Sequence, residues 1–210
     1  MRKRVFGFIT TLVSLAGCAG KIQYPSYYVL NLPAPVLLSS RSAPVLGSVA
    51  VREFDAPRFL RTGPIVYRDS PEKLGFYEYH RWAVDPRRAV TSAVVQQIQS
   101  RGIFRFVDTF DGHGTPDYMM TGAIDHLEEV DQGSDVSIEV GLSARLIDTH
   151  TGDVIWQDAL SKTERVDQHS VPGVVTEMSG MVKTVVAGLV SSMQDRISAA
   201  SPVVRSGTEQ

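Results

Sequence analysis

The chain has 210 residues, of which 21 are basic and 23 are acidic, and its formal net charge at pH 7 is −2. Its composition is that of an ordinary globular protein and its length suits one domain. The single cysteine excludes an intramolecular disulfide, and the acidic balance argues against nucleic acid as a partner.

The first residues have the pattern of an export signal. Arg2, Lys3 and Arg4 precede an apolar stretch over residues 5–16. A membrane-spanning helix needs about 20 apolar residues, so this stretch is too short to span a bilayer. The small residues Ala16 and Gly17 then precede Cys18, as at a signal cleavage site. The sequence therefore predicts a signal peptide over residues 1–17.

Leu15-Ala16-Gly17-Cys18 resembles the lipobox of bacterial lipoproteins, in which the cysteine receives a diacylglyceryl group before cleavage and a further acyl chain afterwards. We therefore expect covalent lipid on Cys18 and no other cofactor, with residues 18–26 as a lipidated tether. The alternative is an ordinary secretory signal that contains a cysteine by chance. Cleavage would remove three basic residues and leave 18 against 23 acidic ones, a formal charge of −5.

The first half of the mature chain alternates strand and turn signals before one well-marked helix. Asp85 can cap the start of this helix, Pro86 suits its first position, and Gly102 suits its left-handed end. The apolar, aromatic and β-branched runs predict strands at residues 27–32, 48–54, 65–68 and 76–79, the last two forming a hairpin.

The second half has the clearest periodicity. Apolar and polar residues alternate over residues 136–146, which is typical of a half-buried strand. A helix over about 172–197 carries a wide apolar face, and close packing is plausible at Gly180 and Gly188. Further strands are expected at residues 104–107, 118–127 and 154–157.

These elements predict a fold with both helices and strands, α/β in the broad sense and α+β more specifically, in a single domain over residues 27–199. A disordered tail is predicted at 200–210. We expect a mixed β-sheet that contains an antiparallel meander and is covered by two main helices. The strand from about 136 should turn back at residues 148–153 to pair with its successor.

The sequence contains no catalytic signature, and its five histidines share no metal-ligand spacing. Asp125-His126 beside Glu128-Glu129 suggests an acid and base pair. Adjacent residues of a strand point to opposite faces, however, so Asp125 and His126 are not expected to serve one site. We therefore predict neither an enzyme nor a metal site.

Residues 55–83 are rich in aromatic and arginine side chains, which are enriched in the cores of protein interfaces. The alternative is that most of these side chains fill the domain's own core, and we expect about half of them to be buried there. The candidate partner-binding residues are Phe59, Leu60, Tyr67, Arg68, Tyr77, Tyr79, Arg81 and Trp82.

Several segments, in this order and spacing, resemble the ABC-type transport auxiliary lipoproteins, the paraquat-inducible protein C-like partners of mammalian-cell-entry (MCE) domain proteins. They are Tyr27-Tyr28-Val29-Leu30, Pro57-Arg58-Phe59-Leu60, residues 65–68, 77–83 and 104–108, and residues 144–148 with 151–156. The resemblance covers nearly the whole mature chain.

The resemblance implies a non-enzymatic accessory that works with an MCE protein and its ABC transporter to move phospholipids or other apolar molecules between two membranes. It also implies a homo-oligomer, which the wide apolar face of the last helix would permit. Ala19, rather than Asp, follows the lipidated cysteine, so the outer membrane is favoured over the inner one. The domain would face the periplasm and dock there. Two alternatives stay open: a structural lipoprotein of another outer-membrane assembly complex, and a periplasmic hydrolase with an unrecognised site.

Overall fold

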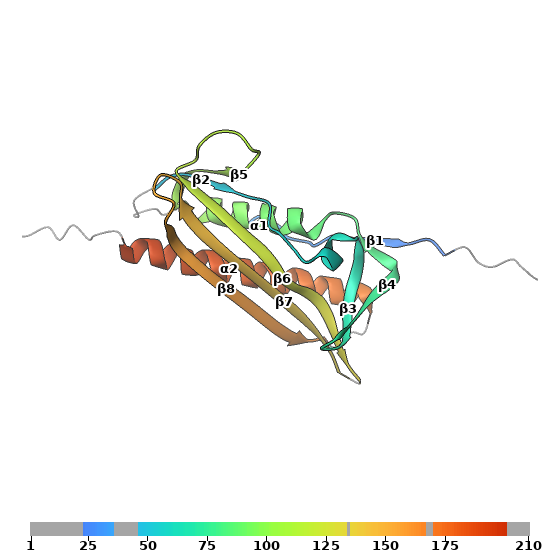
Figure 1. The fold of residues 1–210 in the computed structure, drawn as a ribbon. Coiled ribbons are helices and arrows are strands. Elements are labelled where there is room, and N and C mark those ends of the chain that lie inside the picture. Colours follow the sequence, from blue (N-terminus) through green and yellow to red (C-terminus); the bar gives the residue numbers. More distant parts are fainter. Residues whose placement is uncertain (1–22, 36–45, 134, 167–169, 201–210) are drawn as a thin grey trace, which may run out of the picture.

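The computed structural model describes residues 23–35, 46–133, 135–166 and 170–200. The predicted signal peptide, Cys18, most of the tether and almost all of the predicted tail lie outside these described residues. Within them the chain forms one eight-stranded mixed sheet with two helices on the same face (Figure 1). This arrangement confirms the predicted single-domain α+β fold.

The first helix, α1 (Pro86–Arg101), begins and ends as its sequence predicts. The side chain of Asp85 accepts a hydrogen bond from the backbone N–H of Arg87 at 2.9 Å, and Gly102 ends the helix with a φ of 61°. The apolar stripe of Val90, Val94 and Ile98 is buried.

The second helix, α2 (Val171–Ala200), is the one helix in the described part that is long and apolar enough to cross a membrane. Its apolar face is instead buried in the domain, where α2 packs against β7, β8 and α1. Met178, Val182, Val185 and Met193 are fully inaccessible. The domain's own core therefore covers this face, which is not free to permit self-association.

The sheet contains β1 (Ser26–Tyr28), β2 (Leu46–Val51), β3 (Pro64–Ser70), β4 (Lys73–Trp82), β5 (Phe104–Thr109), β6 (Tyr118–Gln132), β7 (Asp135–Asp148) and β8 (Val154–Arg165), with a short 3-10 helix η1 (Arg58–Arg61) before β3. The strand order is β1-β4-β3-β6-β2-β5, while β6, β7 and β8 form the antiparallel meander. One edge of β6 pairs with β7 along its length; the other pairs with β2 near its start and β3 near its end.

The strands differ in length from their predicted ranges, and β1 and β8 are two examples. β1 stops at Tyr28, because its parallel partner β4 stops at Trp82. β8 continues to Arg165 through residues whose side chains are mostly exposed. An edge strand of this kind is held by its backbone ladder to β7, so its polar sequence gives little periodic signal.

The core lies between the inner face of the sheet and the two helices. Ile138, Val140, Leu142 and Leu146 of β7 are buried in it, as their alternation predicts. A Cβ atom at Gly188 would lie 2.6 Å from Leu160, which confirms close packing there. At Gly180 no heavy atom of the described chain comes within 4 Å of such a Cβ, so the same prediction is wrong at that position.

Candidate functional site: a charged corner and a polar hollow

The candidate partner-binding segment divides into core and surface. Leu60 and Trp82 are buried in the domain's own core, whereas the other six candidates are half-buried. Trp82 lines a small pocket of about 170 Å³ with Arg61, Asp85 and others. Its indole N–H is buried and has no hydrogen-bond partner among the described residues.

The surface part meets the end of β6 at what we call the β3–β6 corner, formed by Arg68, Tyr77, Glu128 and Glu129. Arg68 donates from Nε to Oε1 of Glu128 at 2.7 Å, and from Nη1 to the carbonyl oxygen of Pro71 at 2.8 Å. The side chain of Glu128 is only 1% exposed, and its Oε2 has no hydrogen-bond partner among the described residues. The hydrogen bond to Glu128 raises the pKa of Arg68 above its ordinary value.

Two more ionisable groups extend this corner along the helix-free face of the sheet. Glu139 of β7 lies directly across from Glu128 in the ladder. The ring of His126 lies between the two carboxylates, with Nδ1 at 3.6 Å from Glu128 and Nε2 at 3.8 Å from Glu139. One ligand atom from each of these three residues lies within 4.8 Å of the others, so the trio has donors that suit a divalent cation.

The position of His126 corrects a prediction about β6. The pairing of β6 with β7 shifts register between Ile124 and His126, which marks a β-bulge. Asp125 accepts a hydrogen bond from the Ser143 hydroxyl at 3.1 Å, and His126 lies beside Gly141. Ser143 and Gly141 share one face of β7, so Asp125 and His126 point to the same face. The prediction that these two side chains point to opposite faces is therefore wrong.

Glu129 lies on the opposite, helix-bearing face, across from the buried Ile138. The hydroxyl of Tyr77 donates to its carboxylate, with the two oxygens at 2.9 and 3.1 Å. Burial, together with the negative charge of Glu129, raises the pKa of Tyr77. Tyr77 also contacts the rings of Tyr67 and His80, so aromatic side chains enclose this hydrogen bond.

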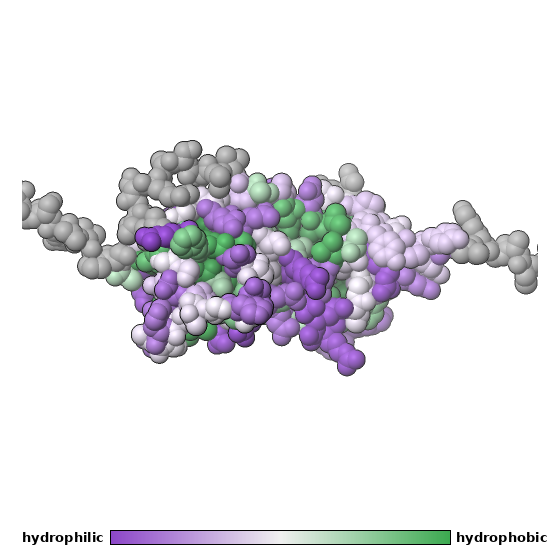
Figure 2. All heavy atoms as spheres, turned by 90° about the horizontal axis from the view of Figure 1, so that it is seen from above, coloured by the Kyte–Doolittle hydropathy of each residue, from purple (hydrophilic) through white to green (hydrophobic). Residues whose placement is uncertain are grey.

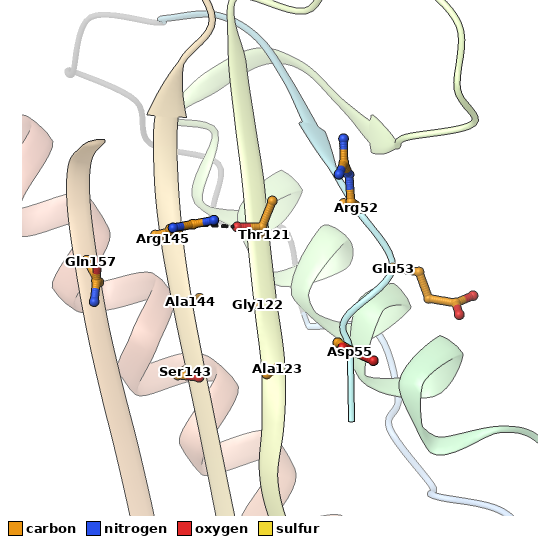
Figure 3. A pocket seen from close by; sticks show the side chains of 10 residues that line it. All are labelled: Arg52, Glu53, Asp55, Thr121, Gly122, Ala123, Ser143, Ala144, Arg145 and Gln157. Carbon is orange, nitrogen blue, oxygen red and sulfur yellow. Dashed lines mark hydrogen bonds between the residues drawn. The ribbon is translucent and has the colours of Figure 1, made fainter. Parts of the chain in front are cut away.

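A polar hollow of about 470 Å³ opens on the same helix-free face, beside the start of β6 (Figure 3). Arg145 donates from Nε to the Thr121 hydroxyl at 3.1 Å across its floor. No sequence motif predicted this hollow, since its lining comes from several separate segments of the chain. They are Arg52, Glu53, Asp55, Thr121, Gly122, Ala123, Ser143, Ala144, Arg145 and Gln157.

The corner and the hollow together define the chemistry of the helix-free face. Arginine, carboxylate, imidazole, hydroxyl and amide groups alternate along it, and each can pair with a charged or hydrogen-bonding group of another molecule. Such a lining suits polar contacts rather than the acyl chains of a lipid.

Comparisons with known proteins agree with this fold. The sequence model of the family described as ABC-type transport auxiliary lipoprotein component matches residues 28–190, from the end of β1 into α2. No curated protein matches the sequence.

Three solved structures share the fold at low sequence identity. A Xanthomonas campestris protein of family DUF330 has a TM-score of 0.68 at 16% identity, over 84% of this chain and 99% of that one. An uncharacterised protein has a TM-score of 0.61 at 14% identity, over 81% and 99%. A hypothetical protein from Chlamydia trachomatis has a TM-score of 0.50 at 11% identity, over 74% and 99%.

Proposed function

The chain belongs to the ABC-type transport auxiliary lipoprotein component family, and from that membership we propose that it docks an MCE-domain protein and its ABC transporter at the outer membrane. In this role it is a non-enzymatic accessory that is anchored by acyl chains on Cys18 and faces the periplasm. The system would move phospholipids or other apolar molecules between the two membranes. The family match over residues 28–190 is the observation that carries this proposal.

The amino-terminal sequence supports the anchor. A single acyl chain binds a bilayer only reversibly, so stable attachment needs more than one chain. A lipobox cysteine receives several. An anchored domain is confined to a plane, and this raises its effective concentration near a partner that ends at the same membrane.

The helix-free face supports a docking role. Both helices cover the opposite face of the sheet, which leaves the corner and the hollow open to a partner (Figure 1, Figure 3). Within the proposed surface, Arg52 and Arg145 are exposed at the hollow, and Arg68 lies on the helix-free side of the corner. Arginine is among the side chains that most often dominate binding energy at protein interfaces. Self-association would have to use surfaces other than the apolar face of α2.

The test is an affinity purification of the tagged full-length protein from detergent-solubilised native membranes, with the partners identified by mass spectrometry. We expect an MCE-domain protein and its ABC transporter to be recovered. Reversing the charge at the hollow with Arg145→Glu should reduce their recovery at least fivefold. Arg196→Glu, on the exposed side of α2, is the matched control and should leave recovery unchanged.

Two further readouts separate the parts of the proposal. Labelled palmitate should enter the wild-type protein and not Cys18→Ala, which should leave the membrane fraction. Recovery of a different envelope complex would overturn the proposed partner. Unchanged recovery with Arg145→Glu would overturn the assignment of the docking face.

A further inference from the structure

Exposed apolar side chains gather around β1, at the end of the molecule where the described chain begins. Tyr24, Tyr27 and Val29 are 77%, 62% and 53% exposed, and the three lie within six positions of the sequence. Tyr28 and Leu30 alternate with them and contribute to the core. β1 is therefore a docked strand, with one face in the core and its apolar outer face uncovered.

Arginines surround these side chains. Arg81 is the ladder partner of Tyr27, and it donates from Nη2 to the carbonyl oxygen of Thr62 at 3.1 Å. This hydrogen bond connects β1 and β4 to the end of η1, which carries the exposed residues Arg58 and Arg61. Arg61 contacts Asp55 at 3.7 Å, whereas no ion pair of Arg58 or Arg81 is found within the described chain. This end is both apolar and cationic.

The length of the tether limits where this surface can lie. Tyr24 lies six positions after Cys18, and an extended chain covers at most about 3.5 Å per residue, so the two are within about 20 Å of each other. The 30-residue α2 is about 45 Å long and runs from this end of the molecule to the opposite one (Figure 1). The β1 end therefore stays within about 20 Å of a membrane that holds Cys18, whereas the opposite end of α2 can lie farther away.

We propose that the β1 surface, formed by Tyr24, Tyr27, Val29, Val84, Arg58 and Arg81, binds the phospholipid bilayer and orients the domain on it. This inference rests on the proposed lipid anchor at Cys18. It adds a second contact with the membrane, through the folded domain itself.

The side chains match the chemistry of a bilayer surface. Tyrosine rings sit at the headgroup level of membranes, with the ring in the apolar layer and the hydroxyl in the polar one. Guanidinium groups bind phosphate oxygens through paired hydrogen bonds, and anionic lipids attract them further. In Figure 2 the end of the molecule that carries β1 is pale purple, the colour of weakly hydrophilic residues. Contact with the bilayer would fix the end of the sheet and point the helix-free face along the membrane rather than into it.

Site-specific fluorescence on the full-length, lipidated protein tests this orientation. The acylated Cys18 thiol is blocked, so a cysteine introduced as Tyr27→Cys can be labelled alone with a polarity-sensitive dye. The protein is reconstituted in vesicles of phosphatidylethanolamine and phosphatidylglycerol that contain a headgroup-region nitroxide lipid. We expect the label at position 27 to be quenched at least twofold more than one at position 106. Phe106→Cys is the matched control, since Phe106 is 66% exposed on β5, away from β1.

Charge and side-chain variants complete the test. For these variants the label is attached to a cysteine introduced as Val84→Cys. The double variant Tyr24→Ser/Tyr27→Ser and the single variant Arg58→Glu should each lower the quenching of this label. Replacing phosphatidylglycerol by phosphatidylcholine in the vesicles should also lower it. Equal quenching at positions 27 and 106 in vesicle-bound protein would overturn this inference and leave the anchor intact. Failure of the protein to float with vesicles would instead overturn the proposed anchor.

Discussion

The two ends of β6 are stabilised in different ways. Near its start, Met120 and Ile124 are buried in the core that α2 covers. Near its end, Glu128 and Glu129 are buried on opposite faces, each with a specific partner. Burial of apolar area is non-directional, whereas a buried carboxylate needs a correctly placed donor. The first region should lose stability mainly through cavities, and the second should be sensitive to the loss of single donors.

The largest effect is expected in the apolar region. Leu146→Ala removes a side chain that is fully buried in β7, and we expect the free energy of unfolding to fall by about 4 kcal/mol, because a cavity is added to the lost burial. Urea denaturation followed by circular dichroism measures this loss. Phe106→Ala, at an exposed position, should change the free energy of unfolding by less than about 0.5 kcal/mol. A small loss for Leu146→Ala would contradict the core assignment.

The next effect belongs to the corner. Arg68→Met leaves the carboxylate of Glu128 buried without its cation, which we expect to cost about 3 kcal/mol in the same assay. The double variant Arg68→Met/Glu128→Leu should regain most of this loss, since no isolated charge is left. Arg165→Met breaks the exposed pair with Asp135 and should cost under about 0.5 kcal/mol. Equal losses for Arg68→Met and Arg165→Met would remove the distinction between the two regions.

A smaller effect tests the other face of the corner. Tyr77→Phe removes the hydroxyl that donates to Glu129 and should cost about 1.5 kcal/mol at neutral pH. The pKa of Tyr77 is raised in the folded state, so its contribution is complete below the unfolded-state value of about 10 and is lost as pH rises above it. The wild type should therefore lose more stability than Tyr77→Phe between pH 9 and 11. Parallel pH dependences of the two proteins would contradict this.

The smallest effect compares two glycines of α2. Gly180→Ala should raise the free energy of unfolding by about 0.5 to 1 kcal/mol, since alanine favours the helix and its methyl group meets open space. Gly188→Ala should gain nothing, because its Cβ would lie 2.6 Å from Leu160. Thermal unfolding of both variants side by side measures the difference, and an equal gain at both positions would argue against close packing of α2 on β8.

The fold of the apolar region could be predicted because its residues repeat. In β7 apolar residues recur at every second position, and in α2 they recur every three to four positions, as expected for a strand and a helix. The cap at Asp85 and the left-handed Gly102 follow from residue types with specific backbone preferences. Gly180 and Gly188 were both predicted to pack closely, but only Gly188 does. A local sequence pattern does not contain the distance between a helix and a strand that is far away in the chain.

The corner could be predicted only in part. The density of aromatic and arginine residues marked Arg68 and Tyr77, but not the partners Glu128 and Glu129, which lie more than fifty residues away in the chain. The register shift at His126 has no sequence signal such as glycine, so strict alternation separated Asp125 from His126. The hollow was missed because its lining residues come from several strands.

The bulge in β6 sets the phase of everything that follows it in that strand. If residues 124–129 alternated regularly, without the bulge, Glu128 would face the helices and Glu129 the opposite side. Arg68 and Tyr77 would then both lose their carboxylate partners. Because two residues of β6 lie opposite one residue of β7 at this point, deleting one residue at position 125 or 126 would make the strand regular and leave the faces of Glu128 and Glu129 unchanged. The extra residue of the bulge thus decides which side of the sheet each of the two carboxylates occupies.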